Sequence, residues 1–275
     1  MHHLDLGLVS DEVSPDFREA VRHGKEWGVS IFEIRVLKSG RIPAVDRAEL
    51  REIQAIVKDQ GLKITALSPG IFKLPLSQTA KLEEELATTL PKTLSLAREF
   101  GAHMVIAFGF QREANEKPEL FNRAVDFMSR AAEMAGKEGI KIIIENEPGF
   151  WCDSGFNTAK LITAVGSPYL RANWDPCNGY GTVDRPYPEG YEAVKQYIAN
   201  VHVKDTKEGS LIRCVPVGEG AIDWKGQLAS LVRDRLVQHV TIETHCLPLV
   251  ENSKRNIDTL RSYLDEIYRQ PENNR

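Results

Sequence analysis

Eight apolar strand segments alternate with helical segments along the chain and predict an α/β protein, a (β/α)8 TIM barrel that spans residues 1–275 as a single domain. Two further observations support this prediction. No glycine-rich dinucleotide fingerprint follows the first strand, and no stretch resembles a linker between two domains. An open doubly wound sheet usually has fewer strands, so it is the weaker alternative.

Hydrophobic periodicity and helix-stop residues set the expected bounds of each element. We expect strands over residues 4–10, 30–36, 62–68, 102–110, 140–147, 170–175, 200–205 and 239–245. We expect helices over residues 16–27, 48–60, 79–100, 118–137, 158–165, 188–198, 222–235 and 253–269. Ser14 or Asp16 can cap the first helix, and Gly61, Gly101 and Gly139 end three of the others.

The composition is that of an ordinary globular protein, with 42% hydrophobic and 27% charged residues and a net charge of -4. This charge and the lack of a Lys/Arg cluster argue against nucleic acid as a partner. The chain does not begin with a basic segment followed by an apolar run, and no stretch approaches the length that spans a bilayer. We therefore expect no membrane partner and a cytoplasmic location.

The four cysteines, Cys152, Cys177, Cys214 and Cys246, lack the close spacing of a CxxC motif. Disulfides are not expected in a chain of this class and size. Three of the four follow predicted strand ends near acidic residues, which leaves a thiolate metal ligand open. The preferred interpretation is that they are small packing residues.

Ligand-type side chains lie near the carboxyl ends of four successive predicted strands. KIIIENEP leads to Glu145, LRANWDPCN to Asp175 and HVTIETH to Glu243, while NVHVKD contains His202. All strand-to-helix loops of a barrel meet at this end, so we expect these four side chains to line one half of its mouth. Two Glu, one Asp and one His form a mostly oxygen ligand set for a divalent metal ion. Mn²⁺ is the preferred ion, with Mg²⁺, Co²⁺ and Zn²⁺ as alternatives.

Side chains two positions apart on a strand share a face, which adds Glu147, Lys204 and His245 to the candidates. Glu147 and Lys204 are expected to contact substrate. Lys204 can neutralise developing negative charge or contact a phosphate, and its alternative role is an ion pair with Asp175 or Glu243. These two roles of Lys204 stay open at this point.

Two further substrate-binding candidates lie in loops. Glu219 stands between two glycines in VGEGAIDW, which permits close backbone approach to a ligand or simply forms a tight turn before a helix. Trp151, together with Phe150 and Trp174, can stack on a sugar ring or pack in the core.

The motifs IIIENEP, NWDPCN, VHVKD, VGEGAIDW and TIETH, in this order, resemble the sugar phosphate isomerase/epimerase family. These are xylose-isomerase-like TIM barrels that include ketose 3-epimerases, hydroxypyruvate isomerase and inosose dehydratase. SDEVSPDF and FEIR also resemble that family, so the resemblance covers nearly the whole chain.

The resemblance implies one divalent metal held by Glu145, Asp175, His202 and Glu243. It also implies catalytic roles for the two glutamates, because ketose epimerases use both to exchange protons with the substrate, one from each face. Family members are often dimers or tetramers, which implies a homo-oligomer.

One position departs from the ketose epimerases, which commonly carry a histidine three positions after the metal-binding aspartate. This chain has Asn178 there, a candidate substrate-binding residue, and the departure counts against free ketose epimerisation. The related barrel of endonuclease IV cuts DNA with a histidine-rich three-metal cluster. Too few of the seven histidines of this chain lie at strand ends to match it.

These observations predict a metal-dependent isomerase or epimerase that acts on a keto-sugar or sugar phosphate through an enediolate. The metal would act as a Lewis acid while Glu145 and Glu243 move the proton. The alternative is a metal-dependent lyase or dehydratase acting on a keto-sugar, keto-glycoside or inosose, which begins with the same proton abstraction and then expels a leaving group. A non-catalytic sugar-binding barrel is less favoured, because it predicts lost ligands and all four are present.

Overall fold

Eight parallel strands close into a barrel in a computed structural model that describes residues 2–114, 116–209 and 213–270. The strands pair around the barrel in the order β1, β12, β9, β8, β7, β6, β5, β2. Their bounds are β1 (Asp5–Val9), β2 (Ile31–Ile34), β5 (Lys63–Ile71), β6 (Met104–Phe108), β7 (Lys141–Glu145), β8 (Leu170–Trp174), β9 (Ile198–Val203) and β12 (His239–Ile242). The predicted (β/α)8 TIM barrel is confirmed, and each predicted strand is present with ends shifted by a few residues.

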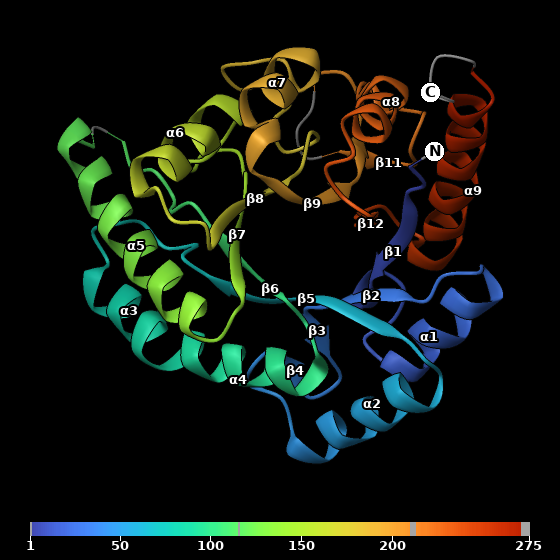
Figure 1. The fold of residues 1–275 in the computed structure, drawn as a ribbon, viewed down its shortest axis with the longest axis horizontal. Coiled ribbons are helices and arrows are strands. Elements are labelled where there is room, and N and C mark those ends of the chain that lie inside the picture. The colour runs from blue at the N-terminus through green and yellow to red at the C-terminus, as the bar shows by residue number, and fades with distance from the viewer. Residues whose placement is uncertain (1, 115, 210–212, 271–275) are drawn as a thin grey trace.

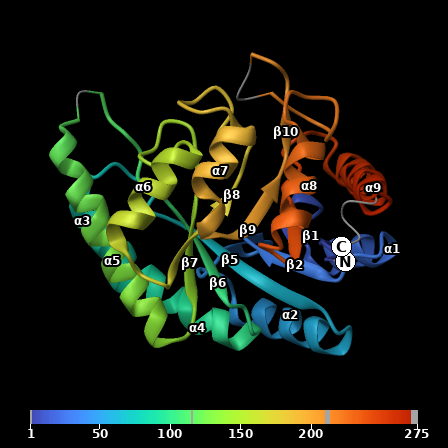
Figure 2. The ribbon, with the colours of Figure 1, turned by 45° about the horizontal axis from the view of Figure 1, so that its top comes forward.

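Helices surround the strands, as Figure 1 shows. They are α1 (Phe17–Glu26), α2 (Arg47–Asp59), α3 (Thr79–Glu84), α4 (Leu90–Phe100), α5 (Phe121–Lys137), α6 (Gly155–Val165), α7 (Tyr191–Val194), α8 (Trp224–Asp234) and α9 (Leu249–Tyr268). Their apolar faces cover the outside of the sheet because parallel strands need a crossover that returns the chain to the same edge. The view in Figure 2 shows β7, β8 and β9 running beside one another, with α6 and α7 outside them.

The single helix predicted over 79–100 is interrupted by a π-helical turn, Glu85–Thr89, which separates α3 from α4. Pro91 lies at the start of α4 and has no N–H to donate to a preceding carbonyl. A wider turn accommodates this missing hydrogen bond. The side chain of Glu85 accepts the Phe72 N–H at 2.8 Å, which fixes the turn against the end of β5.

Other helix bounds also differ from the expectation. Helix α6 begins three residues earlier than predicted because Ser154 caps it by accepting the Asn157 N–H. Helix α9 begins at Leu249, directly after Pro248, and not at 253. The segment predicted as one helix over 188–198 contains a π-helical turn (Pro186–Gly190), α7 and a 3-10 turn (Lys195–Tyr197).

Two short hairpins that the periodicity did not predict stand at the carboxyl end of the barrel. Strands β3 (Val36–Leu37) and β4 (Gly40–Arg41) follow β2, and strands β10 (Asp205–Thr206) and β11 (Cys214–Val215) follow β9. Their two-residue strands are too short to show an alternating pattern.

The barrel interior has an apolar side and a polar side. Ala66, Met104, Ile106, Phe108, Ile143 and Phe150 form a buried cluster that comes mainly from β5, β6 and β7. Asn173, Asn200 and Thr241, on β8, β9 and β12, are fully buried. Among the described residues, no helix is both long and apolar enough to cross a membrane.

Candidate metal centre

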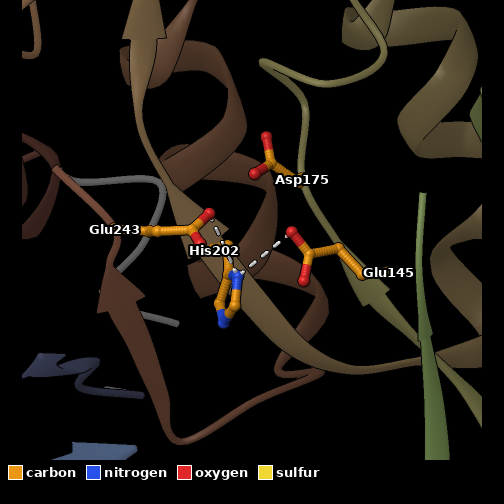
Figure 3. A group of neighbouring side chains, drawn as sticks. All are labelled: Glu145, Asp175, His202 and Glu243. Atoms are coloured by element: carbon orange, nitrogen blue, oxygen red, sulfur yellow. Dashed lines mark ion pairs between the residues drawn. The ribbon is translucent and has the colours of Figure 1, made fainter. Parts of the chain in front are cut away.

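The four predicted metal ligands converge at the carboxyl end of the barrel. Glu145 ends β7, Asp175 follows β8, His202 lies on β9 and Glu243 follows β12. All four are buried, and one possible ligand atom from each lies within 4.8 Å of the others. Figure 3 shows the two glutamates on opposite sides of His202. An ion with bonds of about 2.1 Å holds ligands up to about 4.2 Å apart, so a small contraction would close this set around a metal.

The imidazole of His202 is oriented by a carboxylate beneath it. Its Nε2 lies 2.8 Å from Oε2 of Glu33, and its Nδ1 lies 3.5 Å from both Glu145 and Glu243. This buried Nδ1 has no hydrogen-bond partner. A proton on Nε2, donated to Glu33, leaves the Nδ1 lone pair free, which is the arrangement of a metal-binding histidine. The residues present therefore fit a divalent cation.

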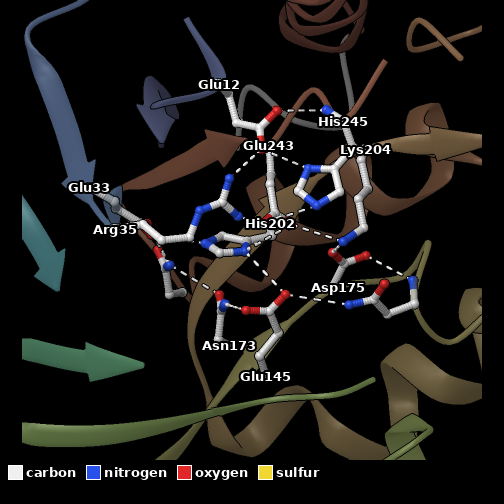
Figure 4. A network of polar contacts seen from close by, with 12 residues as sticks. Glu12, Glu33, Arg35, Glu145, Asn173, Asp175, His202, Lys204, Glu243 and His245 are labelled. Atoms are coloured by element: carbon white, nitrogen blue, oxygen red, sulfur yellow. Dashed lines mark hydrogen bonds and ion pairs between the residues drawn. The ribbon is translucent and has the colours of Figure 1, made fainter. Parts of the chain in front are cut away.

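A layer of buried amides supports the centre from below, as Figure 4 shows in part. Asn200 donates to Glu33 at 2.7 Å and to the side-chain oxygen Oδ1 of Asn173 at 3.0 Å. Asn173 in turn donates to Glu145 at 3.3 Å. These neutral donors hold two carboxylates in place without neutralising their charge.

Lys204 forms the ion pair that was one of its two predicted roles, and it does so with two partners. Its Nζ lies 2.9 Å from Asp175 and 2.9 Å from Glu243. The side chain is buried, and burial alone would lower the pKa of this lysine. The two carboxylates outweigh burial and hold its pKa well above its ordinary value, so it is a permanent cation in the centre.

The pKa values of Asp175 and His202 are both raised by their surroundings. Burial, together with the charges of Glu243 and Glu145, outweighs Lys204 and raises the pKa of Asp175 to about 6. Burial opposes charge on His202, but Glu33 and Glu145 hold its pKa well above its ordinary value. A metal ion would therefore displace protons from this centre when it binds.

Glu243 belongs to a second network that the sequence did not predict. Arg35 donates to Glu243 and Glu12 at 2.5 Å each and to Asp11 at 2.9 Å. His245 completes it, with Nδ1 2.7 Å from Glu12. Glu12, Glu243 and His245 also lie close enough together to hold an ion. Because the guanidinium of Arg35 already bridges Glu12 and Glu243, this network has its own positive charge (Figure 4).

A cavity of about 500 Å³, the mouth cavity, opens over the centre. Of the predicted residues, it is lined by Glu145, Glu147, Asn178, His202, Lys204, Glu243 and His245. Glu147 pairs with Lys73 at 3.0 Å, and the Lys73 ammonium lies 3.8 Å from the ring centre of Phe108. Asn178 donates its N–H to Asp175 at 2.9 Å and its amide to the carbonyl of Asn146 at 2.9 Å.

The structure does not bring Trp151 or Glu219 to the mouth cavity. Trp151 is 8% exposed and packs beside Phe121, with Arg112 over its ring. Glu219 forms an ion pair with Arg255. Both residues follow strand ends, but their side chains contact residues of the outer helices, Phe121 of α5 and Arg255 of α9. The alternation of side chains along a strand ends with the last paired residue, so it does not predict where a loop side chain points.

Four charged residues that line the mouth cavity were missed. Glu33 had a sequence signal, because it is an acid inside the apolar strand SIFEIRV, and Arg35 follows it on the same face. Arg41 and Lys73 lie in the connections after β2 and β5 and carried no such signal. Arg41 donates to the carbonyl of Ser68 at 3.3 Å and forms no ion pair with any described residue.

Comparisons with known proteins agree with this architecture. The sequence profile of a family described as xylose isomerase-like TIM barrel matches residues 21–265. A search of curated proteins found no match.

Similar solved structures include L-ribulose 3-epimerase, with a TM-score of 0.78 and 18% identity over 98% of this chain and 97% of that one. The probable 3-DHS dehydratase AsbF of Bacillus anthracis has a TM-score of 0.77 and 17% identity over 94% and 99% of the two chains. The IOLI protein with a bound zinc atom has a TM-score of 0.78 and 17% identity over 96% and 98%. At this identity the likeness concerns the fold.

Proposed function

Because the chain belongs to the xylose isomerase-like TIM barrel family, we propose that it is a divalent-metal-dependent isomerase or epimerase that acts on a keto-sugar or sugar phosphate through an enediolate. One observation carries the proposal. Glu145, Asp175, His202 and Glu243 each bring one possible ligand atom within 4.8 Å of the others, and Glu145, His202 and Glu243 also line the mouth cavity. The solved structures of similar fold include epimerases and a probable dehydratase.

The same four residues would hold the metal, through three carboxylates and Nδ1 of His202. Mn²⁺ is the ion we propose, because oxygen ligands with one imidazole suit it. When bound, the metal would polarise the substrate carbonyl and offset the negative charge of the enediolate.

In this proposal Glu145 and Glu243 move the substrate proton. They come from β7 and β12 and flank Nδ1 of His202 at 3.5 Å each, so a substrate lying over His202 would meet one carboxylate on each side. One glutamate removes the proton beside the carbonyl, and the other returns a proton to the opposite face, which inverts that carbon. Return to the neighbouring carbon gives isomerisation instead.

The surroundings of the two glutamates differ. Glu145 receives hydrogen bonds from the neutral amides of Asn173 and Asn178, whereas Glu243 contacts the cations Arg35 and Lys204. Burial raises the pKa of Glu243, but Lys204 and His202 outweigh it and hold that pKa well below its ordinary value. Glu243 therefore stays ionised at neutral pH, which is the charge state that a proton acceptor needs.

The second candidate is a lyase or dehydratase, and Asn178 favours it. Its amide cannot take up or release a proton at the position where ketose epimerases commonly carry a histidine. The side-chain amide donates to the backbone carbonyl of Asn146 and the backbone N–H donates to the carboxylate of Asp175, so Asn178 supports the centre. A substrate with a leaving group beyond the enediolate would then eliminate before a proton returns.

Solvent exchange followed by NMR tests the proposal. The Mn²⁺-loaded protein is incubated in D₂O with keto-sugars, their phosphates, a keto-glycoside and an inosose. Deuterium beside the carbonyl with an intact carbon skeleton supports isomerase or epimerase chemistry, and loss of water or of an aglycone supports the lyase. Absence of exchange with every compound, with bound metal verified, would count against both for these substrate classes.

Three finer points stay predictions from the sequence. They are Mn²⁺ as the metal, a cytoplasmic location and assembly into a homo-oligomer. Substrate contacts by Glu147, Asn178 and Lys204 are part of the proposal, and Arg41 and Lys73 join them because they line the same cavity.

A further inference from the structure

A second cavity, the basal cavity, lies at the opposite end of the barrel and has a volume of about 280 Å³. Its lining comes from the amino-terminal starts of the barrel strands, including Lys63 on β5, Met104 on β6, Lys141 on β7, Arg171 on β8 and His239 on β12. Glu145 is four residues beyond Lys141 on β7, so the two ends of the lumen are about 13 Å apart along a strand.

The basal cavity is strongly basic in a protein whose net charge is -4. Lys63, Lys141 and Arg171 line it, with His103 and His239 beside them. None of the described residues in its lining is acidic. None of the three permanent cations forms an ion pair with a described residue, and the guanidinium of Arg171 donates only to the carbonyl of Leu170, at 3.1 Å. Three unpaired cations around one cavity repel one another, and a bound anion would offset this repulsion.

Two buried polar atoms in the same lining also lack partners. His239 is 6% exposed and its Nε2 has no hydrogen-bond partner, and Thr65 is 5% exposed and its Oγ1 has none. A buried polar group without a partner costs free energy, so such groups are rare and mark places where a ligand or water binds. His239 lies on the lumen face of β12, because Glu243 of the metal centre is four positions beyond it.

We propose that the basal cavity binds a phosphate-type oxyanion, either inorganic phosphate or the phosphoryl group of a small metabolite. The three cations supply charge-assisted donors to the oxyanion, and Thr65 and His239 supply the buried polar contacts. The volume exceeds the roughly 30 Å³ share of one water molecule several-fold, so a molecule larger than a single water has room. This site is separate from the metal centre and does not depend on the proposed function.

Isothermal titration of the full chain tests the site. Inorganic phosphate and glycerol phosphate are the probes for the two sources, glycerol is the neutral control, and chloride is held constant. Saturable binding of phosphate is the expected result, and tighter binding of glycerol phosphate would favour a metabolite over the free ion. Absence of saturable binding of either probe would overturn the proposal and leave water as the occupant.

Two variants locate the binding. The double variant Lys141→Gln/Arg171→Gln should weaken phosphate binding about tenfold or more, because each cation is a charged donor. The matched control Lys58→Gln/Lys92→Gln removes two exposed cations from α2 and α4 and should bind phosphate as the wild type does. Equal losses in both double variants would show nonspecific attraction and contradict the site.

A third variant separates a binding role from a structural one. Thr65→Val keeps the shape of the side chain and removes only the unpartnered hydroxyl, so the unfolding midpoint without phosphate should not fall. Phosphate affinity should drop roughly threefold for one lost neutral hydrogen bond. Titrations are repeated with and without Mn²⁺. Binding that requires the metal and survives the Lys141→Gln/Arg171→Gln change would place the anion at the metal centre and refute the proposal.

Discussion

The two ends of the barrel are built from the same strands and carry opposite charge. Three strands carry a basic residue near the amino end and an acidic residue four positions later, at or just beyond the carboxyl end. The pairs are Lys141 and Glu145 on β7, Arg171 and Asp175 on β8, and His239 and Glu243 on β12. Side chains four apart on a strand share a face. Because all eight strands run in the same direction, one repeated feature of the sequence becomes an acidic centre at one end and a basic cavity at the other.

The two ends differ in how their charges are compensated. At the candidate metal centre the charges are buried and paired, and Lys204 lies 2.9 Å from both Asp175 and Glu243. In the basal cavity Lys141 is exposed and forms no ion pair with a described residue. A buried charge is stable only when another group of the protein pairs with it, whereas a solvent-exposed charge is hydrated and can pair with an ion from solution. Substitutions at the two ends should therefore have different consequences.

The largest difference should appear in turnover. Glu145→Gln or Glu243→Gln should lower kcat by about 10²- to 10⁴-fold, because each removes a carboxylate that moves the substrate proton. Lys141→Gln, on the strand that carries Glu145 but at its other end, should keep kcat near the wild-type value. Steady-state kinetics with the substrate found by the exchange experiment measure both. Full activity of either glutamine variant would remove that glutamate from proton transfer.

Stability should separate the two lysines. Lys204→Met should lower the free energy of unfolding of the metal-free protein by about 3–5 kcal/mol, because it leaves the buried carboxylate of Asp175 without its cation and removes one of the two cations beside Glu243. Lys141→Met should change it by no more than about 0.5 kcal/mol, as for other exposed sites. Urea unfolding in the presence of a chelator gives both values. Similar losses of unfolding free energy in the two variants would mean that the burial of Lys204 does not make it more important for stability than the exposed Lys141.

Metal affinity should depend on Glu33, beneath the centre. Glu33→Gln removes the carboxylate that orients Nε2 of His202 and should weaken Mn²⁺ binding by about 10- to 100-fold. Calorimetric titration with Mn²⁺ measures the change, and circular dichroism checks the fold. Phosphate binding in the basal cavity should stay the same in this variant. An unchanged Mn²⁺ affinity would mean that the hydrogen bond to Glu33 does not prepare His202 for metal binding.

The pH dependence gives a smaller contrast. The pKa of His202 lies well above its ordinary value and that of Asp175 is about 6, so protons and metal compete for both ligands. Mn²⁺ affinity should therefore fall as pH drops through 6, by about tenfold per pH unit for each proton that must leave. Sulfate serves as the oxyanion probe here, because its charge does not change between pH 8 and 5. Its binding in the basal cavity should not weaken over this range, because Lys and Arg stay protonated. A flat Mn²⁺ affinity over this range would contradict the pKa directions.

Much of the fold was predictable because its signals are local. The isoleucines before Glu145 and the glycines that end helices, such as Gly101, depend on neighbouring residues, so strands and most helices follow from periodicity. The break at 85–89 was not predictable from spacing, because the apolar pattern continues across it and only the missing N–H of Pro91 marks it.

The candidate ligands were also predictable, because strand ends in a parallel barrel meet at one place. Their supports were harder to find. Arg35 reaches Asp11, Glu12 and Glu243 across 24, 23 and 208 positions of the chain, and no local pattern encodes the longest of these contacts. Trp151 and Glu219 were expected at the site because they follow strand ends, but the loops that carry them turn away from the mouth cavity.

The sequence by itself determined the barrel, the strand order and the four side chains that converge at its mouth, because alternation along each strand and the parallel direction of all strands are properties of the chain. Only the tertiary structure decided which way His202 points, which cation pairs with Asp175 and Glu243, and that the basic residues at the strand starts surround one cavity. The physical reason is that these features depend on distances between residues far apart in sequence, and packing sets those distances.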